Sequence, residues 1–567
     1  MSTIKQEYDA AIAQLCGAGA PFELERRLHG GREYTAYKQV PDTVLPLLNE
    51  ARAHGDKDFL VYEGERFTFA QVFASADALA NALKDDFGIG VGDRVAIAMR
   101  NYPEWIIGFL GIALSGAAAV PLNSWGQRAE IEYGLTDSGA RLVLGDQQRL
   151  SLIYQDLENL GIPAIAVRSE AELLARPGVY DYQKLVATHA GKPVPVVDVS
   201  AEDMAIMLYT SGTTGKPKGA MTSQTALAQG LYNFDVVGMA CAMTNPDSIQ
   251  AMIAKGFEPA ALLAVPLFHL SGLHSVFLLS LRAGRKIVMM YKWDAEAAVA
   301  LVEQERLTML NLVPSMLQEM LSSPSFERTD TSSLFNVGAG GAATPPKLTA
   351  MIAEKVENPF PGTGWGLTET NSSVSSFTGK AILHKPGSAG FLHPIMELKA
   401  CDDEGRELPQ GEPGILWVKT ISLIDGYWNR PDANAADFAD GWFSTGDIGY
   451  VDEEGFVFLS DRAKDLIIRG GENIYPAEIE AICYHHPSVR EAAVFAIPDD
   501  ALGEEAGACI VVRKGQDIDE QEFRELLGGQ LAKFKVPRYI WFRSEPLPRN
   551  PAGKILKKQL RELYSKA

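Results

Sequence analysis

A run of hydroxyl, glycine and lysine residues from Tyr209 to Gly219 is the part of this sequence best suited to chemistry. It reads Tyr-Thr-Ser-Gly-Thr-Thr-Gly-Lys-Pro-Lys-Gly and follows an apolar run, Met204–Leu208, that predicts a buried strand. Glycines let backbone N–H groups approach an anion, hydroxyls add donors, and lysines add positive charge. A Walker P-loop does not fit, because Pro217 follows Lys216. We therefore predict a loop that wraps polyphosphate; the alternative is a surface linker, for which this composition is unusual.

Four further stretches carry residue types that could act on a nucleotide. One places an aromatic ring beside a hydroxyl and a carboxylate, one sets an acid in a turn, and two are rich in basic residues and glycine. They are Gly364–Glu369, Ser444–Asp447, Asp461–Glu478 and Pro548–Lys554. Each has an ordinary structural interpretation when read alone: Asp447 as a turn residue, Trp365 as core, and Arg462, Lys464 and Lys554 as solvated charges. Their order along the chain favours a shared site.

The elements expected to position these stretches alternate between helices and strands. Apolar residues recur at helical spacing over Phe69–Leu83, with Thr68 as the N-cap. Further helices are expected at Asn101–Ala118, Gln127–Ser138, Thr222–Val237, Leu273–Leu281 and from Asp294 to about Gln304, and strands at Arg94–Ala98, Ala119–Leu122, Arg141–Leu144, Leu262–Pro266 and Lys286–Met290. This alternation indicates largely parallel sheets covered by helices. The first forty residues are weakly patterned and are expected to drape over the body.

The pattern changes after Glu397, where short strands between Gly, Pro and Asp turns predict a small β-rich subdomain. A new unit begins after Asp461, with a helix from Pro476, Ile479 and Ile482 inward, and another from Asp519 to about Leu531. A chain of 567 residues is too long for one core. The predicted fold class is α/β, with a large N-terminal domain of stacked α/β subdomains over 1–460, a connection at 461–466 and a small α+β C-terminal domain over 467–567.

Composition limits the class of function. The net charge of −20 argues against general nucleic-acid binding, although the tail from Lys533 to Ala567 is strongly basic. The five cysteines are far apart and form no metal-binding spacing, which favours a reduced, cytoplasmic setting. No secretory signal opens the sequence, and the longest apolar stretch, Trp105–Pro121, predicts a buried helix that runs into a strand rather than a membrane span.

Taken in this order, the five stretches resemble those of the adenylate-forming superfamily, which includes acyl-CoA synthetases, adenylation domains and firefly luciferases. The resemblance runs from about Phe67 to Arg561. It implies an ATP-dependent ligase that joins a carboxylic acid to CoA through an acyl-AMP, with ATP and CoA as co-substrates and Mg²⁺ as cofactor. A carboxylate is a poor electrophile, so transferring AMP to it requires phosphate-binding N–H groups, a divalent metal and a mobile cation.

The resemblance implies an ATP site built from distant parts of the chain. Glu369 would bind Mg²⁺, Thr368 would contact the α-phosphate, Asp447 would accept the ribose hydroxyls and Arg462 would brace the ribose. Gly340, Gly341 and Ala342 would leave a flat slot for adenine, with Trp365 on its other face. The residues implied for ATP are Thr210, Ser211, Gly212, Thr213, Thr214, Gly215, Lys218, Gly340, Gly341, Ala342, Trp365, Gly366, Asp447 and Arg462. Two positions depart from the family: Trp365 stands where Tyr is usual, and Thr363 where an amide or acid is usual.

The C-terminal domain is mobile in this family, and the resemblance places its hinge at Lys464. One orientation would bring the catalytic Lys554 to the carboxylate and α-phosphate. The other would present Arg469, Gly470, Gly471 and Glu472 to the pantetheine arm of CoA. The basic tail would then approach an anionic reaction centre.

Pro266–Gly272 matches the family stretch beside the acid, where His269 would act as a catalytic gate; the alternative is a satisfied structural histidine. Relatives that activate amino acids carry an aspartate here, so His269 favours an acid with an apolar body. The expected pocket residues are Asn233, Phe234, His269, Val313, Val337, Gly338 and Gly366, together with the Leu273–Leu281 helix. Small residues leave room for a medium- or long-chain fatty acid or a bulky aryl-alkanoic or alicyclic acid.

Two other functions stay open at this point. The enzyme could stop at acyl-AMP and load a carrier protein, or the chain could be a nucleotide-binding protein that has lost catalysis. The retention of Glu369, Asp447 and Lys554 together speaks against the second. We expect a monomer or homodimer without an integral membrane segment, whose partners are ATP, CoA and a small carboxylic acid.

Overall fold

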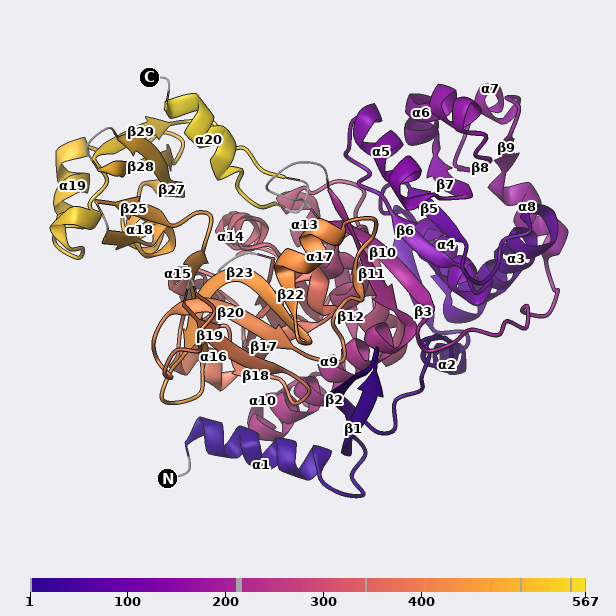
Figure 1. The fold of residues 1–567 in the computed structure, drawn as a ribbon, viewed down its shortest axis with the longest axis horizontal. Helices are drawn as coiled ribbons and strands as arrows, with labels where there is room; N and C mark the ends of the chain where they lie inside the picture. Colours follow the sequence, from indigo (N-terminus) through magenta and orange to yellow (C-terminus); the bar gives the residue numbers. More distant parts are fainter. Residues whose placement is uncertain are drawn as a thin grey trace.

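The computed structural model describes residues 3–210, 217–341, 344–402, 404–470, 472–499, 502–550 and 553–565. The fold contains two large helix-covered sheets whose strands interleave along the chain, a small β sheet and a separate C-terminal sheet (Figure 1). The predicted α/β fold class is thereby confirmed.

The first large sheet is parallel over most of its width. From β10 to β9 each pair of neighbouring strands is parallel, whereas β11 and β21 add antiparallel strands at one edge. Its order is β21 (Gly426–Tyr427), β11 (Lys218–Ser223), β10 (Met204–Thr210), β6 (Ala118–Pro121), β5 (Arg94–Ala98), β7 (Leu142–Asp146), β8 (Ala164–Val167) and β9 (Val179–Asp181). The helices between its strands are α3 (Phe69–Phe87), α4 (Pro103–Leu114), α5 (Arg128–Ser138), α6 (Gln147–Leu160), α7 (Ala171–Leu174) and α8 (Tyr182–His189).

The second large sheet contains strands that come before and after most strands of the first sheet along the chain. Its order is β18 (Phe391–Leu392), β17 (Ser373–Thr378), β16 (Phe360–Gly366), β15 (Asn336–Ala339), β14 (Met309–Leu312), β12 (Ala260–Leu263), β13 (Lys286–Met289), β3 (Asp58–Tyr62) and β4 (Glu65–Thr68). Its accompanying helices are α2 (Leu45–Glu50), η1 (Ala51–His54), α9 (Gln224–Thr244), α10 (Pro246–Lys255), α13 (Ala295–Glu305), α14 (Pro314–Ser322), α15 (Pro346–Lys355) and α16 (Lys380–His384). From β3 to β16 each pair of neighbouring strands is parallel, whereas β4 at one edge and β17 and β18 at the other add antiparallel strands.

The largest hydrophobic cluster joins the two sheets through α3 and α4. Trp105, Phe109 and Phe277 have no more than 2% of their surface exposed, and Phe277 packs edge-on against Phe109. Burying one such side chain contributes about 1.5–3 kcal/mol. The apolar stretch that might have suggested a membrane span is therefore a core helix followed by a strand, as predicted. Among the described residues, no helix is long and apolar enough to cross a membrane.

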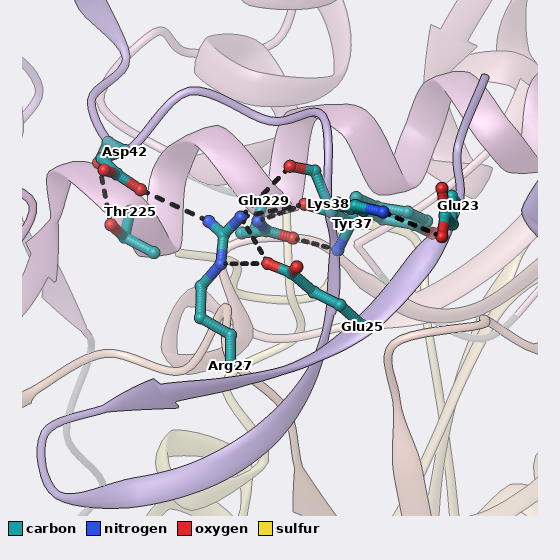
Figure 2. A network of polar contacts seen from close by, with 8 residues as sticks. All are labelled: Glu23, Glu25, Arg27, Tyr37, Lys38, Asp42, Thr225 and Gln229. Atoms are coloured by element: carbon teal, nitrogen blue, oxygen red, sulfur yellow. Dashed lines mark hydrogen bonds and ion pairs between the residues drawn. The ribbon is translucent and has the colours of Figure 1, made fainter. Parts of the chain in front are cut away.

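The N-terminal segment is more ordered than the sequence suggested. It forms α1 (Ile4–Cys16) and a hairpin of β1 (Leu24–His29) and β2 (Arg32–Tyr37), which the weak sequence pattern did not suggest. It lies against the body as expected, with Tyr8 stacked on Phe391. Figure 2 shows how α9 holds this segment: the Gln229 side chain exchanges hydrogen bonds with the backbone of Tyr37 at 2.9 and 3.1 Å. Thr225 donates to the Asp42 carbonyl at 2.8 Å. Local sequence periodicity does not reveal these contacts, because the partners lie almost two hundred positions apart.

One predicted helix has an irregular centre. Leu273–Leu281 lies within α11 (Leu270–Gly272), the π-helical η2 (Leu273–Leu278) and α12 (Leu279–Ala283). Single π turns occur often at functional sites, and side-chain periodicity alone does not predict them. The other predicted helices of the N-terminal part differ at their ends: α9 starts at Gln224 and extends to Thr244 because its buried face continues past Val237.

The small β sheet has the order β19 (Glu397–Cys401), β20 (Gly414–Lys419), β23 (Trp442–Val451) and β22 (Phe438–Ala439), and β24 (Val457–Arg462) also pairs with β23. Helix α17 (Pro431–Asp437) precedes β22. The C-terminal sheet contains β26 (Glu472–Ile474), β25 (Ile467–Arg469), β28 (Gly503–Val512), β27 (Val489–Asp499) and β29 (Tyr539–Arg543). Its helices are α18 (Pro476–Cys483), α19 (Glu520–Gly528), η4 (Lys533–Lys535) and α20 (Lys557–Tyr564). The turn around Lys464 connects β24 to β25.

Two of the helices predicted for the C-terminal part differ in detail from those in the structure. Ile479 is buried as predicted, but its inward-facing companion on α18 is Cys483, and Ile482 is only half-buried. Asp519 caps α19 by accepting a hydrogen bond from the Glu522 N–H at 2.9 Å, yet the helix ends at Gly528, before Leu531. Glycines at 528 and 529 favour this earlier end.

Candidate active site

The carboxylate of Asp447 lies between two donors from separate elements. Antiparallel pairing of β23 and β24 sets Asp447 opposite Arg462, whose Nε lies 2.8 Å from Oδ1. Trp365, near the end of β16, donates from its indole Nε1 to Oδ2 at 2.8 Å. Both Asp447 and Trp365 are more than nine-tenths buried. Three residues that the sequence placed in one ATP site are therefore in direct contact.

A second carboxylate, that of Glu369, lies on the short helix η3 (Thr368–Thr370) and is buried. The hydroxyl of Tyr427 donates to its Oε1 at 2.8 Å. Burial raises the pKa of Glu369, and this hydrogen bond and the Lys218 charge oppose the rise. Thr368, on the same short helix, is half-buried beside it.

Tyr427 is a site residue that the sequence analysis missed. It lies on β21, which pairs with β11, so its ring comes beside Lys218 at the start of β11. The Lys218 Nζ lies 3.8 Å from the ring centroid and 2.9 Å from Asp437 Oδ2. A tyrosine within a Gly-Tyr-Trp-Asn run carries no charge or motif that links it to Glu369, and only the pairing of the edge strand brings them together.

The glycine-rich loop is bracketed by a hairpin. Thr210 ends β10 and pairs with Lys218 at the start of β11, so the loop between them leaves from the end of a buried strand as predicted. The loop residues Ser211, Gly212, Thr213, Thr214 and Gly215 lie outside the described residues, as do Ala342 and Gly471. Their roles stay predictions.

The glycines predicted beside adenine follow β15 directly. Gly340 donates its N–H to the Leu312 carbonyl at 3.0 Å, and Gly341 has a φ of +79°, a conformation that favours glycine. Gly366 is exposed, and a Cβ there would lie 2.5 Å from the Ser372 carbonyl oxygen. Thr363, the second departure from the family pattern, lies 3.3 Å from the Thr344 hydroxyl.

The C-terminal tail reaches the same region. Gly553, with a φ of +81°, packs so closely that an added Cβ would lie 3.1 Å from Val313 Cγ2 at the start of α14. Burial lowers the pKa of the half-buried Lys554 to about 8, with further lowering from Arg462 and Lys464 and opposition from Asp447 and Asp465. These charges belong to the predicted ribose site and hinge. The structure therefore brings Lys554 toward Asp447 and Arg462.

The predicted acid-pocket residues separate into two groups. Val313, which follows β14, and Val337, within β15, are both buried, and Gly338 lies close to Gly362 of the neighbouring β16. Asn233 instead lies in a buried network, where its amide contacts the Tyr37 hydroxyl, Ser372 and His393. Phe234, the next residue on α9, is half-buried.

His269 occupies the position before α11 without a side-chain capping hydrogen bond, and burial lowers its pKa to about 4. Its Nε2 is buried without a hydrogen-bond partner among the described residues. The imidazole is therefore neutral at ordinary pH. The alternative of a fully satisfied structural histidine therefore does not hold for Nε2 among the described residues, and the role of His269 as a gate stays a prediction.

The residues predicted for CoA lie on the β25–β26 hairpin. Arg469 forms an ion pair with the buried Glu505 of β28, with 2.6 Å between Nε and Oε1, and Gly470 adopts a φ of +58° in the turn. Glu472 is exposed opposite Arg469. In this arrangement the Arg469 side chain is paired with Glu505 of the C-terminal sheet, while the tail carries Lys554 toward the residues predicted for the nucleotide.

The donor set suits a metal held mainly by its substrate. No group of three or more His, Cys, Asp or Glu side chains that could hold a metal ion occurs in the part of the chain that the structure describes. Glu369 presents a single buried carboxylate, with Oε1 already accepting from Tyr427. Mg²⁺ keeps most of its ligands as water and phosphate and is often held by one or two carboxylates, so the residues present fit it.

Comparison with known proteins decides the family. A family model described as AMP-binding enzyme matches residues 47–428, and its C-terminal domain matches residues 478–554. The chain belongs to the AMP-binding enzyme family. The resemblance predicted from the sequence is therefore confirmed, and the CoA ligases among the similar proteins confirm the enzyme class, an AMP-forming acid–thiol ligase.

Members of the AMP-binding enzyme family similar to this chain have different acids in their names. Long-chain-fatty-acid–CoA ligase FadD13 of Mycobacterium tuberculosis is 35% identical over 88% of this chain and 93% of its own length. Feruloyl-CoA synthase of Amycolatopsis sp is 33% identical over 88% and 94%. Among solved structures, ATP-bound MatB from Rhodopseudomonas palustris has a TM-score of 0.77 at 30% identity, covering 91% of this chain and 99% of that one.

Proposed function

We propose that the protein is an ATP-dependent carboxylate–CoA ligase that makes an acyl-CoA through an acyl-AMP and releases pyrophosphate. The proposed substrate is a medium- or long-chain fatty acid, or a bulky aryl-alkanoic or alicyclic acid. The observation that carries the proposal is the approach of the Lys554 tail to Val313 and to the charges of Asp447 and Arg462. The fatty-acid and feruloyl ligases similar to this chain support an acid with an apolar body.

In the first step, an oxygen of the acid attacks the α-phosphorus of ATP, and the bond from that phosphorus to pyrophosphate breaks. Lys554 in its protonated form would stabilise the negative charge that builds up on the acid and α-phosphate oxygens. Asp447 and Arg462 would hold the ribose. Thr210, Lys218 and the loop between them would hold the phosphates that leave.

Mg²⁺, when bound, would neutralise phosphate charge and favour departure of pyrophosphate. We propose Glu369 as the protein ligand of Mg²⁺, with the Tyr427 hydroxyl holding its Oε1 in place by a hydrogen bond. The Lys218 side chain is restrained by its ion pair with Asp437 and its contact with the Tyr427 ring, so its charge would stay near the phosphates.

In the second step, the thiolate of CoA would attack the acyl carbon, and the bond from that carbon to AMP would break. We propose that the C-terminal part turns about Lys464 between the steps, which removes Lys554 and presents the Arg469–Glu472 hairpin. His269, with a neutral imidazole, would lie beside the bound acid and would add no charge to an apolar pocket.

A substrate screen tests this function directly. Purified protein is incubated with ATP, Mg²⁺, CoA and a panel of fatty, aryl-alkanoic and alicyclic acids, and thioesters are detected by mass spectrometry. We expect a thioester with at least one apolar class and none with amino acids. If acyl-AMP forms but no acid of the panel gives a thioester, the result would contradict the CoA step and favour transfer to a carrier protein.

A further inference from the structure

The local strand geometry sets the direction of the Trp365 side chain. It sits beside an irregularity in the pairing of β16 and β17, where Trp365 faces Ser375 and the register shifts before Gly366. Such bulges turn a side chain to a new direction. The glycines on both sides fit only without side chains, because an added Cβ would lie 2.9 Å from Ser376 Cβ at Gly364 and 2.5 Å from the Ser372 oxygen at Gly366.

The indole N–H of this fixed ring meets Asp447. The distance of 2.8 Å between Nε1 and Oδ2 is that of a hydrogen bond to a charged acceptor, which is stronger than one between neutral groups. Arg462 occupies the other oxygen at 2.8 Å. The Asp447 carboxylate is therefore oriented from both sides by residues of two different strands.

Two acceptor positions remain on this carboxylate. An ionised carboxylate has about four lone-pair positions, of which Trp365 and Arg462 take one each. The remaining two suffice for the two hydroxyls of a ribose. A tyrosine at position 365 has no donor at the place of the indole nitrogen, so this contact depends on the departure from the family residue.

We propose that Trp365 is a positioning residue that acts on the ribose through Asp447. Its N–H orients the carboxylate so that the free lone pairs face the ribose hydroxyls. Its ring thereby connects the part of the site predicted for the base with the part predicted for the ribose. The proposal rests on the nucleotide site described above. It adds that the 365 side chain contributes to ribose recognition separately from any stacking on the base.

The test compares nucleotides that differ only in the ribose. Binding of AMP, 2′-deoxy-AMP and 3′-deoxy-AMP is measured by calorimetry for the wild-type protein, Trp365→Phe and Trp365→Tyr. Trp417→Phe serves as the control, because Trp417 is a half-buried tryptophan of β20 in the neighbouring small sheet. Binding of AMP needs neither acid nor CoA, so the result can be read even if the ligase assay finds no thioester.

We expect the wild type to prefer AMP over a deoxy analogue, and we expect this preference to fall about fivefold or more in Trp365→Phe and Trp365→Tyr. Trp417→Phe should keep it. A purely structural or stacking role would weaken all three nucleotides equally, and that result, or unchanged binding of all three, would overturn the proposal. If Trp365→Phe does not fold, as judged by thermal unfolding, Trp365→Tyr gives the same two outcomes.

Discussion

The hydroxyl of Tyr427 donates a hydrogen bond to Oε1 of Glu369 at 2.8 Å, across 58 positions of sequence. We propose that this bond fixes the carboxylate that binds Mg²⁺. Tyr427→Phe should therefore raise the Mg²⁺ concentration for half-maximal acid-dependent ATP–pyrophosphate exchange by about 10-fold to 100-fold, the range for loss of an outer partner of a metal ligand. Tyr450→Phe, on β23, is the matched control. An unchanged Mg²⁺ requirement in Tyr427→Phe would contradict the role.

Gly553 offers a test of the contact between the tail and the N-terminal part. Gly553→Ala adds a Cβ 3.1 Å from Val313 Cγ2 at a backbone φ of +81°. Because small displacements of a catalytic group are costly, we expect adenylation to fall about tenfold or more, while thioester formation from supplied acyl-AMP is spared.

The control separates backbone strain from the contact. Gly515 has a similar φ of +77° but nothing within 4 Å of an added Cβ. Gly515→Ala should lose stability to a similar extent and keep adenylation. Equal loss of adenylation in both variants would show that strain, and not the Val313 contact, explains the effect.

The pH dependence of the first half-reaction reports on Lys554. Its pKa is lowered to about 8 by burial, Arg462 and Lys464, so the side chain is charged below this pH and neutral above it. If the charged form is required, kcat/KM for ATP in pyrophosphate exchange should fall as the pH rises through about 8. Thioester formation from supplied acyl-AMP should lack this loss.

An arginine at the same position provides the check. The guanidinium of Lys554→Arg stays charged over this pH range, so its residual activity should not fall near pH 8. A fall that persists in Lys554→Arg would assign the ionisation to another group. No fall in the wild type would contradict the need for a charged lysine.

Lys464 lies in the turn between β24 and β25, where we place the hinge. Lys464→Pro fixes φ at this position and restricts the preceding residue, so it should slow thioester formation from acyl-AMP more than adenylation. Lys464→Ala removes the charge without restricting the backbone and should affect both steps much less. Symmetric losses in Lys464→Pro would remove this residue as the hinge.

Several residues that the structure brings together could be identified beforehand because their types are unusual in their setting. Short runs of glycine, hydroxyl and charge identified Asp447, Arg462, Glu369 and Lys554, and a family pattern supplied their order. The structure places Asp447 and Arg462 in direct contact and brings Lys554 within reach of their charges. The parallel sheets were predictable for a similar reason, since strands such as Arg94–Ala98 are short apolar runs with clear ends.

What the sequence did not show depends on contacts between distant segments. Tyr427 meets Glu369 only because the two-residue strand β21 joins the edge of a sheet. The Trp365–Asp447 bond requires a β-bulge and two glycines that no local pattern connects to Asp447. Asn233, expected at the acid, is instead buried against Tyr37 and His393 of segments that the sequence analysis did not associate with α9.

The most direct test of the account measures the two half-reactions of Lys554→Ala separately, beside the exposed neighbour variant Lys558→Ala. Acid-dependent ATP–pyrophosphate exchange reports adenylation, and thioester formation from supplied acyl-AMP and CoA reports the second step. We predict that Lys554→Ala loses about 100-fold or more of the first activity, as for a group that stabilises transition-state charge, and keeps the second, while Lys558→Ala keeps both. Equal loss of both steps in Lys554→Ala, or full retention of adenylation, would contradict the central claim.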